Sequence, residues 1–367
     1  MFLLCVKITQ DMKATVKRIV VMGGSFNPPT VAHYRLMRNA IYTIDADIGF
    51  FVPVSDAYLR RKMRNSHPPV VLSPELRIEM LRAMSTDSRM AVCDKEIGTI
   101  EARTVPTLTE LQADYPDAEI YFLMGADKIG LLKHLAEKRD FLKHFRVALY
   151  SREESMIESI IADDEILSRD KNRIVILPQP EGTAGISSSL IRRHLLDGEP
   201  YDDLMCRGAW ELFSHLKPED FPDVIDRFTG EYDFLSNRYN CRFTWQGQKY
   251  CNAEAAFQSS KCTYTADRKF FSTCSADKAV AKGNTLTPPT DWQQRRTEIM
   301  ESVLRAKFEQ NPALVDRLTA TADRRIINGN SRHDTYWGVD LYTWQGENRL
   351  GKIIMDIRNK YRNEIHD

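Results

Sequence analysis

The chain has 367 residues, more than one hydrophobic core usually serves, so we expect two domains. Lysine and arginine together number 51, as do aspartate and glutamate, and this balance excludes a general coat for nucleic acid. Any phosphate binding must therefore be local.

Cysteine usage and hydropathy indicate where the protein resides. The seven cysteines include no C-x-x-C pair and no Cys/His set at zinc spacing, which indicates reduced thiols in a cytoplasmic protein without structural metal. No apolar run reaches the length of a membrane span, so we expect no membrane partner.

The first half alternates strand-like and helix-like segments. Arg18–Met22 predicts a buried strand, and Val31–Ile44 predicts a helix with apolar residues at helical spacing. The alternation continues with strands at 48–53, 120–124, 146–150 and 173–177 and helices at 73–84, 105–115 and 131–144. Such alternation predicts a parallel α/β sheet with a site at the carboxyl ends of its strands.

A change in composition predicts where the first domain ends. Leu216–Asp223 is rich in proline and acidic residues, which is typical of a linker, and we place the domains at 1–220 and 221–367. Downstream, Phe228–Tyr250 predicts short strands. Helical periodicity follows at 252–262, 276–283, 292–309 and 312–319. The second domain is therefore predicted to be α+β and rich in helix.

The segment GGSFNPPTVAH, from Gly23 to His33, lies between the first strand and its helix. Glycines let a phosphate approach backbone N–H groups at a helix start, and His33 can hydrogen-bond an α-phosphate as charge builds. Two glycines alone would indicate only a tight turn with a capping histidine. The pattern is neither G-x-G-x-x-G nor a Walker loop.

The run from Gly24 to His33 resembles the G-[ST]-F-[ND]-P-x-[TH]-x-x-H loop of the nicotinamide/nicotinate mononucleotide adenylyltransferases. Ile186–Arg192 matches a second motif of that family, I-S-S-T-x-I-R. The resemblance covers roughly 17–213. It implies a Rossmann-like, doubly wound nucleotidyltransferase domain that uses Mg²⁺ and ATP to adenylylate nicotinamide or nicotinate mononucleotide. Thr30 and Ala32 depart from the H-x-G-H of many bacterial members, so the choice of pyridine stays open.

The resemblance also implies site residues. His33 and Arg192 would be catalytic, with Arg192 offering a fork to the outer phosphates. The implied ATP and phosphate ligands are Gly23, Gly24, Ser25, Phe26, Gly125, Asp127, Ser187, Ser188 and Ser189. The implied mononucleotide ligands are Asn27, Tyr58, Arg60, Arg61 and Thr104. Alone, the serines would be an ordinary helix cap and the arginines a solvated basic loop.

A second constellation lies in the second half. Glu254, Gln258 and Lys261 stand at i, i+4 and i+7, so they share one helix face, which alone would indicate a solvated, salt-bridged surface. Their surroundings resemble the NADAR family of YbiA-type proteins over about 226–358. The segments that carry this resemblance are Tyr232–Asn237, Leu304–Glu309, His333–Gly338 and Gly346–Gly351.

NADAR resemblance implies a YbiA-like α+β domain that hydrolyses N-glycosidic or ADP-ribosyl bonds. Glu254 and Lys261 are the predicted catalytic pair, since a carboxylate can stabilise an oxocarbenium-like centre and a lysine can transfer a proton. Asn237, Trp337 and Asn348 are the predicted ligands for an NAD- or ADP-ribose-type molecule. A core tryptophan beside turn asparagines is the alternative.

Together the halves predict a bifunctional enzyme of NAD metabolism. Homo-oligomers are common in the first family, so the resemblance implies an assembly of identical chains. Two alternatives stay open. The second domain can be a non-catalytic sensor of NAD or ADP-ribose, and the first can adenylylate another acceptor such as pantetheine phosphate, FMN or a glycerol phosphate.

Overall fold

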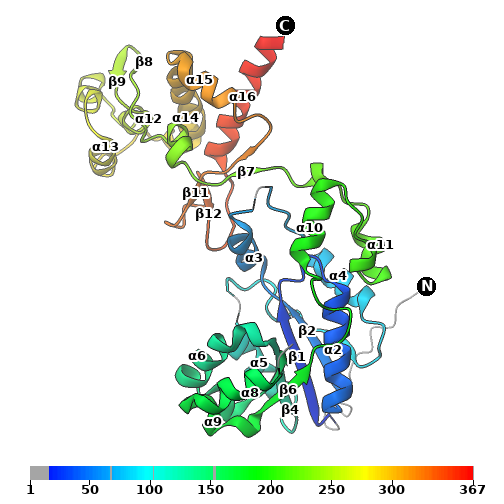
Figure 1. Ribbon diagram of the computed structural model, residues 1–367. Helices are drawn as coiled ribbons and strands as arrows, with labels where there is room; N and C mark the ends of the chain where they lie inside the picture. The colour runs from blue at the N-terminus through cyan, green and yellow to red at the C-terminus, as the bar shows by residue number, and fades with distance from the viewer. Residues whose placement is uncertain (1–15, 67, 102, 152–153, 367) are drawn as a thin grey trace. The chain divides into compact units, whose positions relative to one another are not determined.

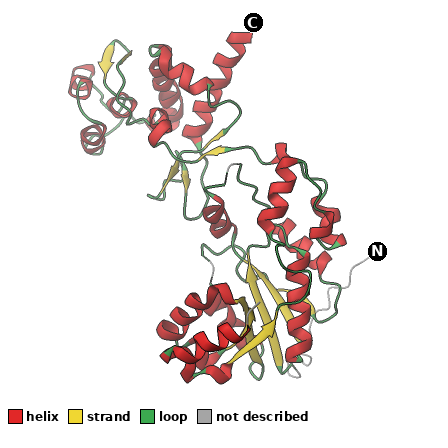
Figure 2. Ribbon diagram, viewed as in Figure 1, coloured by secondary structure: helices red, strands yellow, loops and turns green. Residues whose placement is uncertain are grey.

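The computed structural model describes residues 16–66, 68–101, 103–151 and 154–366 (Figure 1). The described residues up to Phe221, apart from the segment around 65–69, form one compact unit, and those from Pro222 onward form a second. Figure 2 shows an extended sheet in the first unit and mostly helix in the second.

The first unit is built on a six-stranded sheet in the order β3-β2-β1-β4-β5-β6, with every neighbouring pair parallel. Its strands are β1 (Arg18–Gly24), β2 (Ile48–Pro53), β3 (Met90–Val92), β4 (Glu119–Gly125), β5 (Arg146–Ser151) and β6 (Ile174–Pro178). The order reverses between β1 and β4, which makes the sheet doubly wound and confirms the predicted fold class. A crevice is expected at this reversal, outside the carboxyl ends of the two strands.

Helices cover both faces of this sheet (Figure 1). In β1, Ile19 and Val21 join the core of one face and Val20 joins that of the other, because successive side chains of a strand point to opposite sides. The Val20 face packs against α2 (Val31–Ile44), α4 (Pro74–Met84), α10 (Ser188–Asp197) and α11 (Arg207–Phe213). The opposite face packs against α5 (Thr104–Asp114), α6 (Ile129–Arg139), α7 (Phe141–His144), α8 (Glu154–Asp163) and α9 (Glu165–Arg169).

The second unit encloses a separate hydrophobic core, which includes Phe257 and Leu304. Its helices are α12 (Ala253–Ser259), α13 (Ala276–Gly283), α14 (Trp292–Glu309), α15 (Pro312–Thr319) and α16 (Arg349–His366). Three strand pairs accompany them: β7 (Val224–Ile225) with β10 (Arg325–Ile326), β8 (Phe243–Trp245) with β9 (Gln248–Tyr250), and β11 (Gly329–Asn330) with β12 (Val339–Asp340). The predicted helix-rich α+β class is confirmed.

None of the described helices is both long enough and apolar enough to span a membrane.

Lys307 of α14 is a fully buried lysine of the second unit. Its Nζ donates to the carbonyl oxygens of Phe234, at 2.6 Å, and Ser236, at 3.0 Å. Burial lowers the pKa of Lys307 to about 8. The lysine thus fixes the backbone directly before Asn237, a predicted ligand of the second site.

We expect the free energy of unfolding of the second unit to rise between pH 8 and pH 10.5. In this window the unfolded chain binds a proton at Lys307 that the folded chain has already released. Each pH unit therefore adds up to about 1.4 kcal/mol. Denaturant titrations across the window measure the slope. Lys307→Met keeps the aliphatic stem and should reduce it, so a variant with the wild-type slope would contradict the assignment.

Candidate functional site

A pocket of about 640 Å³ opens at the carboxyl ends of β1 and β4, where the strand order reverses. The loop after β1, the segment after β4 and the first turn of α2 line it. The end of α3 (Asp56–Met63), Tyr150 of β5, the loop after β6 and the start of α10 also line it. The fold therefore brings together the two motifs that the sequence places far apart.

Two buried side chains hold the glycine loop in place. Arg77 of α4 donates to the carbonyl oxygens of Ser25, at 3.1 Å, and Val54, at 2.9 Å. Asn27 donates to the Val70 carbonyl at 2.7 Å, and its own side-chain oxygen accepts from the Leu72 N–H at 2.9 Å. Asn27 lines the pocket, but its amide is occupied by backbone groups. Its side chain therefore shapes the loop.

His33 faces the pocket from the first turn of α2. Its Nδ1 accepts a hydrogen bond from the backbone N–H of Thr30 at 2.9 Å, and Thr30 in turn caps the helix through its side chain. Burial, reinforced by the charge of Lys128, lowers the pKa of His33 to about 4. Because Nδ1 is an acceptor, the neutral ring carries its proton on Nε2. His33 is thus a neutral hydrogen-bond donor at neutral pH.

The start of α10 docks on the glycine loop. Ser187 caps the helix by accepting from the Leu190 N–H at 3.2 Å, and Ser188 donates to the Pro28 carbonyl at 2.7 Å. Arg192 donates to the Asn27 carbonyl at 2.7 Å and to the Ser189 hydroxyl at 3.0 Å. Burial lowers the pKa of Arg192. One guanidinium therefore ties the two motifs together beside the pocket.

Two lysines that the sequence reasoning missed also line this pocket. Lys62 lies in the last turn of α3, and Lys128 follows the predicted Gly125–Asp127 segment. Asp127 is the one acidic side chain among the described lining residues. With Arg192, the lysines make the pocket a strongly cationic cavity, the electrostatic setting that binds phosphates. Lys128 could have been found from the sequence, because it directly follows the Gly125–Asp127 motif.

The predicted phosphate ligands and catalytic residues of the first unit all line this pocket: Gly23, Gly24, Ser25, Phe26, His33, Gly125, Asp127, Ser187, Ser188, Ser189 and Arg192. Four predicted mononucleotide ligands do not line it: Tyr58, Arg60, Arg61 and Thr104. Arg60 donates to Asp56 at 2.7 Å, and Arg61 donates to the Ile100 carbonyl at 2.8 Å. Their role in binding stays a prediction.

A residue larger than glycine at position 24 is expected to destabilise the fold. A Cβ there would lie 3.0 Å from the ring of Phe26, which is itself buried and packs edge-to-face on His33 and Phe51. Gly24→Ala should therefore displace Phe26 and cost about 1–3 kcal/mol of unfolding free energy. Thermal unfolding measures the change, with an alanine at the open position Gly130 as control. A Gly24→Ala protein as stable as wild type would contradict the close packing.

The second unit holds a pocket of about 690 Å³. Glu254, Gln258, Asn237 and Trp337 line it, and so do three arginines, Arg227, Arg238 and Arg332, that the sequence reasoning missed. Trp337 packs edge-to-face on Phe257, with ring centroids 5.4 Å apart. The pocket thus combines an aromatic wall, a carboxylate and cationic side chains.

The predicted catalytic pair is divided between this pocket and its surroundings. Glu254 lines the pocket and accepts a hydrogen bond from the side chain of Gln258 at 2.8 Å. Lys261 does not line it; its Nζ donates to the Gly283 carbonyl at 3.3 Å and lies 5.2 Å from the Trp292 ring centre. Partial burial lowers the pKa of Lys261, against an opposing effect of Glu254. The charge of Glu254 therefore favours the protonated form of Lys261.

The two predicted asparagines differ in their contacts. Asn237 lines the pocket, and its side-chain oxygen has no hydrogen-bond partner among the described residues. Asn348 does not line it: its side chain accepts from the Asn328 N–H and donates to the Ile326 carbonyl, both at 2.9 Å. Asn348 therefore holds backbone segments together, and a ligand role for it stays a prediction.

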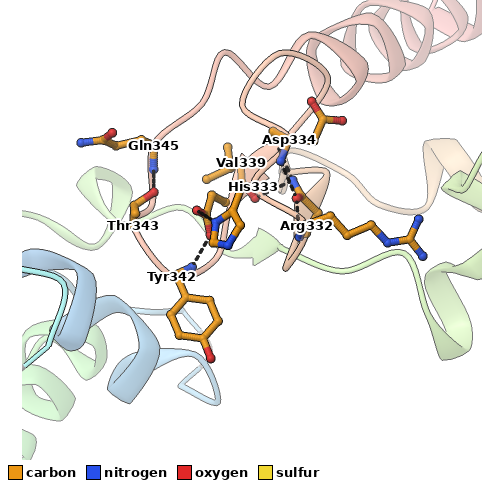
Figure 3. Close-up of polar contacts among 9 residues, drawn as sticks. Arg332, His333, Asp334, Val339, Tyr342, Thr343 and Gln345 are labelled. Atoms are coloured by element: carbon orange, nitrogen blue, oxygen red, sulfur yellow. Dashed lines mark hydrogen bonds and ion pairs between the residues drawn. The ribbon is translucent and has the colours of Figure 1, made fainter.

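A short loop positions Trp337. Asp334 accepts from the Trp337 N–H at 2.9 Å, and His333 contacts the buried carboxylate of Asp340 at 2.7 Å. The hydrogen bond from His333 lowers the pKa of Asp340. Figure 3 shows Arg332 extending away from His333, which lies beside Tyr342. These contacts fix the wall that carries the tryptophan.

Comparison with known proteins agrees with the division of the chain into two units. Residues 21–194 match the family model described as cytidylyltransferase-like, and residues 226–362 match the NADAR domain model. The chain therefore joins a cytidylyltransferase-like domain to a NADAR domain.

Named relatives refine the first assignment. A "Probable nicotinate-nucleotide adenylyltransferase" of Shouchella clausii is 28% identical over 187 residues, which are 50% of this chain and 88% of that protein. A protein of the same name from Carboxydothermus hydrogenoformans is 29% identical over 191 residues, 51% of this chain and 90% of its own length. The first unit is thus similar to nicotinate-nucleotide adenylyltransferases.

Two solved structures resemble parts of the chain. Nicotinic acid mononucleotide adenylyltransferase of Plasmodium falciparum, complexed with APC, has a TM-score of 0.41 and 17% identity over 56% of this chain and 98% of that one. E. coli YbiA has a TM-score of 0.36 and 27% identity over 40% of this chain and 89% of that one.

Proposed function

We propose that the first unit transfers the adenylyl group of ATP to nicotinate mononucleotide, giving deamido-NAD and pyrophosphate. The observation that carries the proposal is the neutral His33, which presents an Nε2–H donor to the same cationic pocket as Arg192. The names of the relatives favour nicotinate over nicotinamide mononucleotide, which would give NAD.

The proposed reaction is a direct displacement. A phosphate oxygen of the mononucleotide attacks the α-phosphorus of ATP in line, and the bond to the β-phosphate oxygen breaks with its electron pair leaving on pyrophosphate. His33 donates from Nε2 to an α-phosphate oxygen as charge develops, and Arg192 holds the outer phosphates. No proton needs to be abstracted, because the attacking oxygen is already ionised. Positioning by the rigid loop supplies much of the acceleration.

We propose Mg²⁺ as the cofactor, carried in with ATP. Among the described residues, no three His, Cys, Asp or Glu side chains are grouped to hold a metal. Asp127 is the lone carboxylate among the described residues of the pocket, so the residues fit an ion bound chiefly by phosphate oxygens and water. The ion would neutralise charge on the phosphates during displacement.

Labelled ATP tests this proposal. With a label on the α-phosphorus, the dinucleotide should carry the label, and with a label on the γ-phosphorus, pyrophosphate should carry it. Transfer of the γ-label to the mononucleotide would indicate a kinase and reject the proposal.

For the second unit we propose hydrolysis of an N-glycosidic or ADP-ribosyl bond, with Glu254 as the catalytic carboxylate. The support is its place in one pocket with Trp337 and with Arg227 and Arg332, which suit a base and an anionic group. Incubation with NAD, ADP-ribosylated guanosine and phosphorylated N-ribosides, followed by chromatography, tests the proposal. Binding of such a ligand without turnover would instead indicate a sensor domain.

A further inference from the structure

Helix α3 carries three consecutive cationic side chains, Arg60, Arg61 and Lys62, and only Lys62 lines the pocket of the first unit. Arg60 donates a hydrogen bond to Asp56, and Arg61 donates one to the Ile100 carbonyl. The Nζ of Lys62 lies 3.0 Å from the hydroxyl oxygen of Ser25, in the glycine loop. Lys62 therefore reaches the loop where the α-phosphate is expected.

Charge around Lys62 is unbalanced. Lys128 and Arg192 line the same pocket, and none of the three forms an ion pair within the described part of the chain. Loss of solvation, followed by the charges of Lys128 and Arg192, lowers the pKa of Lys62. Three mutually repelling cations with one nearby carboxylate, Asp127, form a site that an anion would stabilise.

We propose that Lys62 is the residue of α3 that binds a substrate phosphate in this pocket, the part that the sequence assigned to Arg60 and Arg61. This inference rests on the proposed adenylyl transfer. The ammonium offers two further donors beyond its contact with Ser25, and a phosphate placed between Lys62 and Arg192 relieves their repulsion. The phosphate can belong to ATP or to the mononucleotide, and kinetics distinguishes the two.

The test compares Lys62→Met with Arg61→Met, and uses Lys143→Met, an exposed lysine of α7 paired with Asp140, as the control. The KM for one substrate should rise about 10- to 100-fold in Lys62→Met, the loss expected for a charged hydrogen bond. Arg61→Met should change it much less. Which KM rises identifies the phosphate that Lys62 holds. Unchanged KM values in Lys62→Met, or a larger rise in Arg61→Met, would overturn the inference.

A pH profile separates binding from a structural role. Since a lysine binds phosphate only when protonated, the affected KM should rise as pH increases through the Lys62 pKa. Lys62→Arg, which stays charged, should restore affinity and move this rise to higher pH. A Lys62→Arg protein with the profile of Lys62→Met would reject the charge-based role.

Pyrophosphate binding, measured by calorimetry, tests the residue independently of turnover. Calorimetry with nicotinate mononucleotide is run beside it, and wild type should bind whichever of the two carries the phosphate held by Lys62 at least about tenfold more tightly than Lys62→Met does. If wild type binds it in this way but makes no dinucleotide, the proposed function fails and the assignment of Lys62 stands. If wild type makes dinucleotide and Lys62→Met binds pyrophosphate and both substrates equally well, the assignment alone fails.

Discussion

Replacing His33 with alanine is expected to lower kcat for adenylyl transfer by about 100- to 1000-fold, as loss of one preorganised donor does at other charged transition states. The ring is a neutral donor whose tautomer is fixed by the Thr30 N–H. Because this contact acts on the developing charge, kcat should fall more than KM rises. Steady-state rates with ATP and mononucleotide varied in turn measure both.

The fold should survive this change, although the Thr30 N–H loses its partner. A melting temperature within a few degrees of wild type is the check, and His134→Ala, at an exposed position of α6, is the matched control. Near-normal turnover of a folded His33→Ala protein would remove His33 from the mechanism.

The wild-type pH profile offers a second view of His33. Its pKa is lowered to about 4, so the ring stays neutral down to acidic pH. We expect no inflection in kcat from His33 near pH 6.5, the ordinary histidine value, and loss of the Thr30 contact only as pH falls toward 4. An inflection near 6.5 that disappears in His33→Ala would contradict the buried, neutral state.

Replacing Glu254 with glutamine is expected to lower turnover by the second unit about 100- to 10,000-fold. The amide keeps the size of the side chain, but it lacks the negative charge that stabilises an oxocarbenium-like centre or orients water. Hydrolysis of the substrate found for wild type measures the effect. Adenylyl transfer by the first unit should remain at the wild-type rate, which serves as an internal control for folding.

Glu298→Gln, on the exposed side of α14, is the matched control for this change. If both variants keep full hydrolysis, Glu254 is not the catalytic carboxylate. If wild type and Glu254→Gln bind the ligand equally and neither hydrolyses it, the second unit is a sensor.

The spacing of apolar residues and the positions of turn-forming residues predicted most of the fold. The helix Val31–Ile44 and the helix Trp292–Glu309 have the bounds that their apolar spacing predicts. The sequence reasoning missed β3 and α3, since a three-residue strand has too few side chains for a period and α3 is dominated by charge. It also missed α16, whose first residues coincide with the family motif Gly346–Gly351.

The residues that line the pocket were predicted correctly where a sequence motif fixes the backbone. They were not predicted where packing decides which side chain faces the pocket. The glycine loop and the start of α10 meet because strand order and helix docking require it. Which of Arg60, Arg61 and Lys62 faces inward depends on how α3 rotates against the sheet, which three adjacent cations do not encode. Asn348 shows the same limit, because its partners lie about twenty residues away.

The most direct test of the central claim is a product assay with the whole protein. Purified chain would be incubated with ATP, Mg²⁺ and, in turn, nicotinate mononucleotide, nicotinamide mononucleotide, pantetheine phosphate, FMN and a glycerol phosphate, with dinucleotide and pyrophosphate quantified together. We predict equal amounts of deamido-NAD and pyrophosphate, with nicotinate mononucleotide the best acceptor. Folded protein that releases pyrophosphate with none of the pyridine nucleotides would contradict the account.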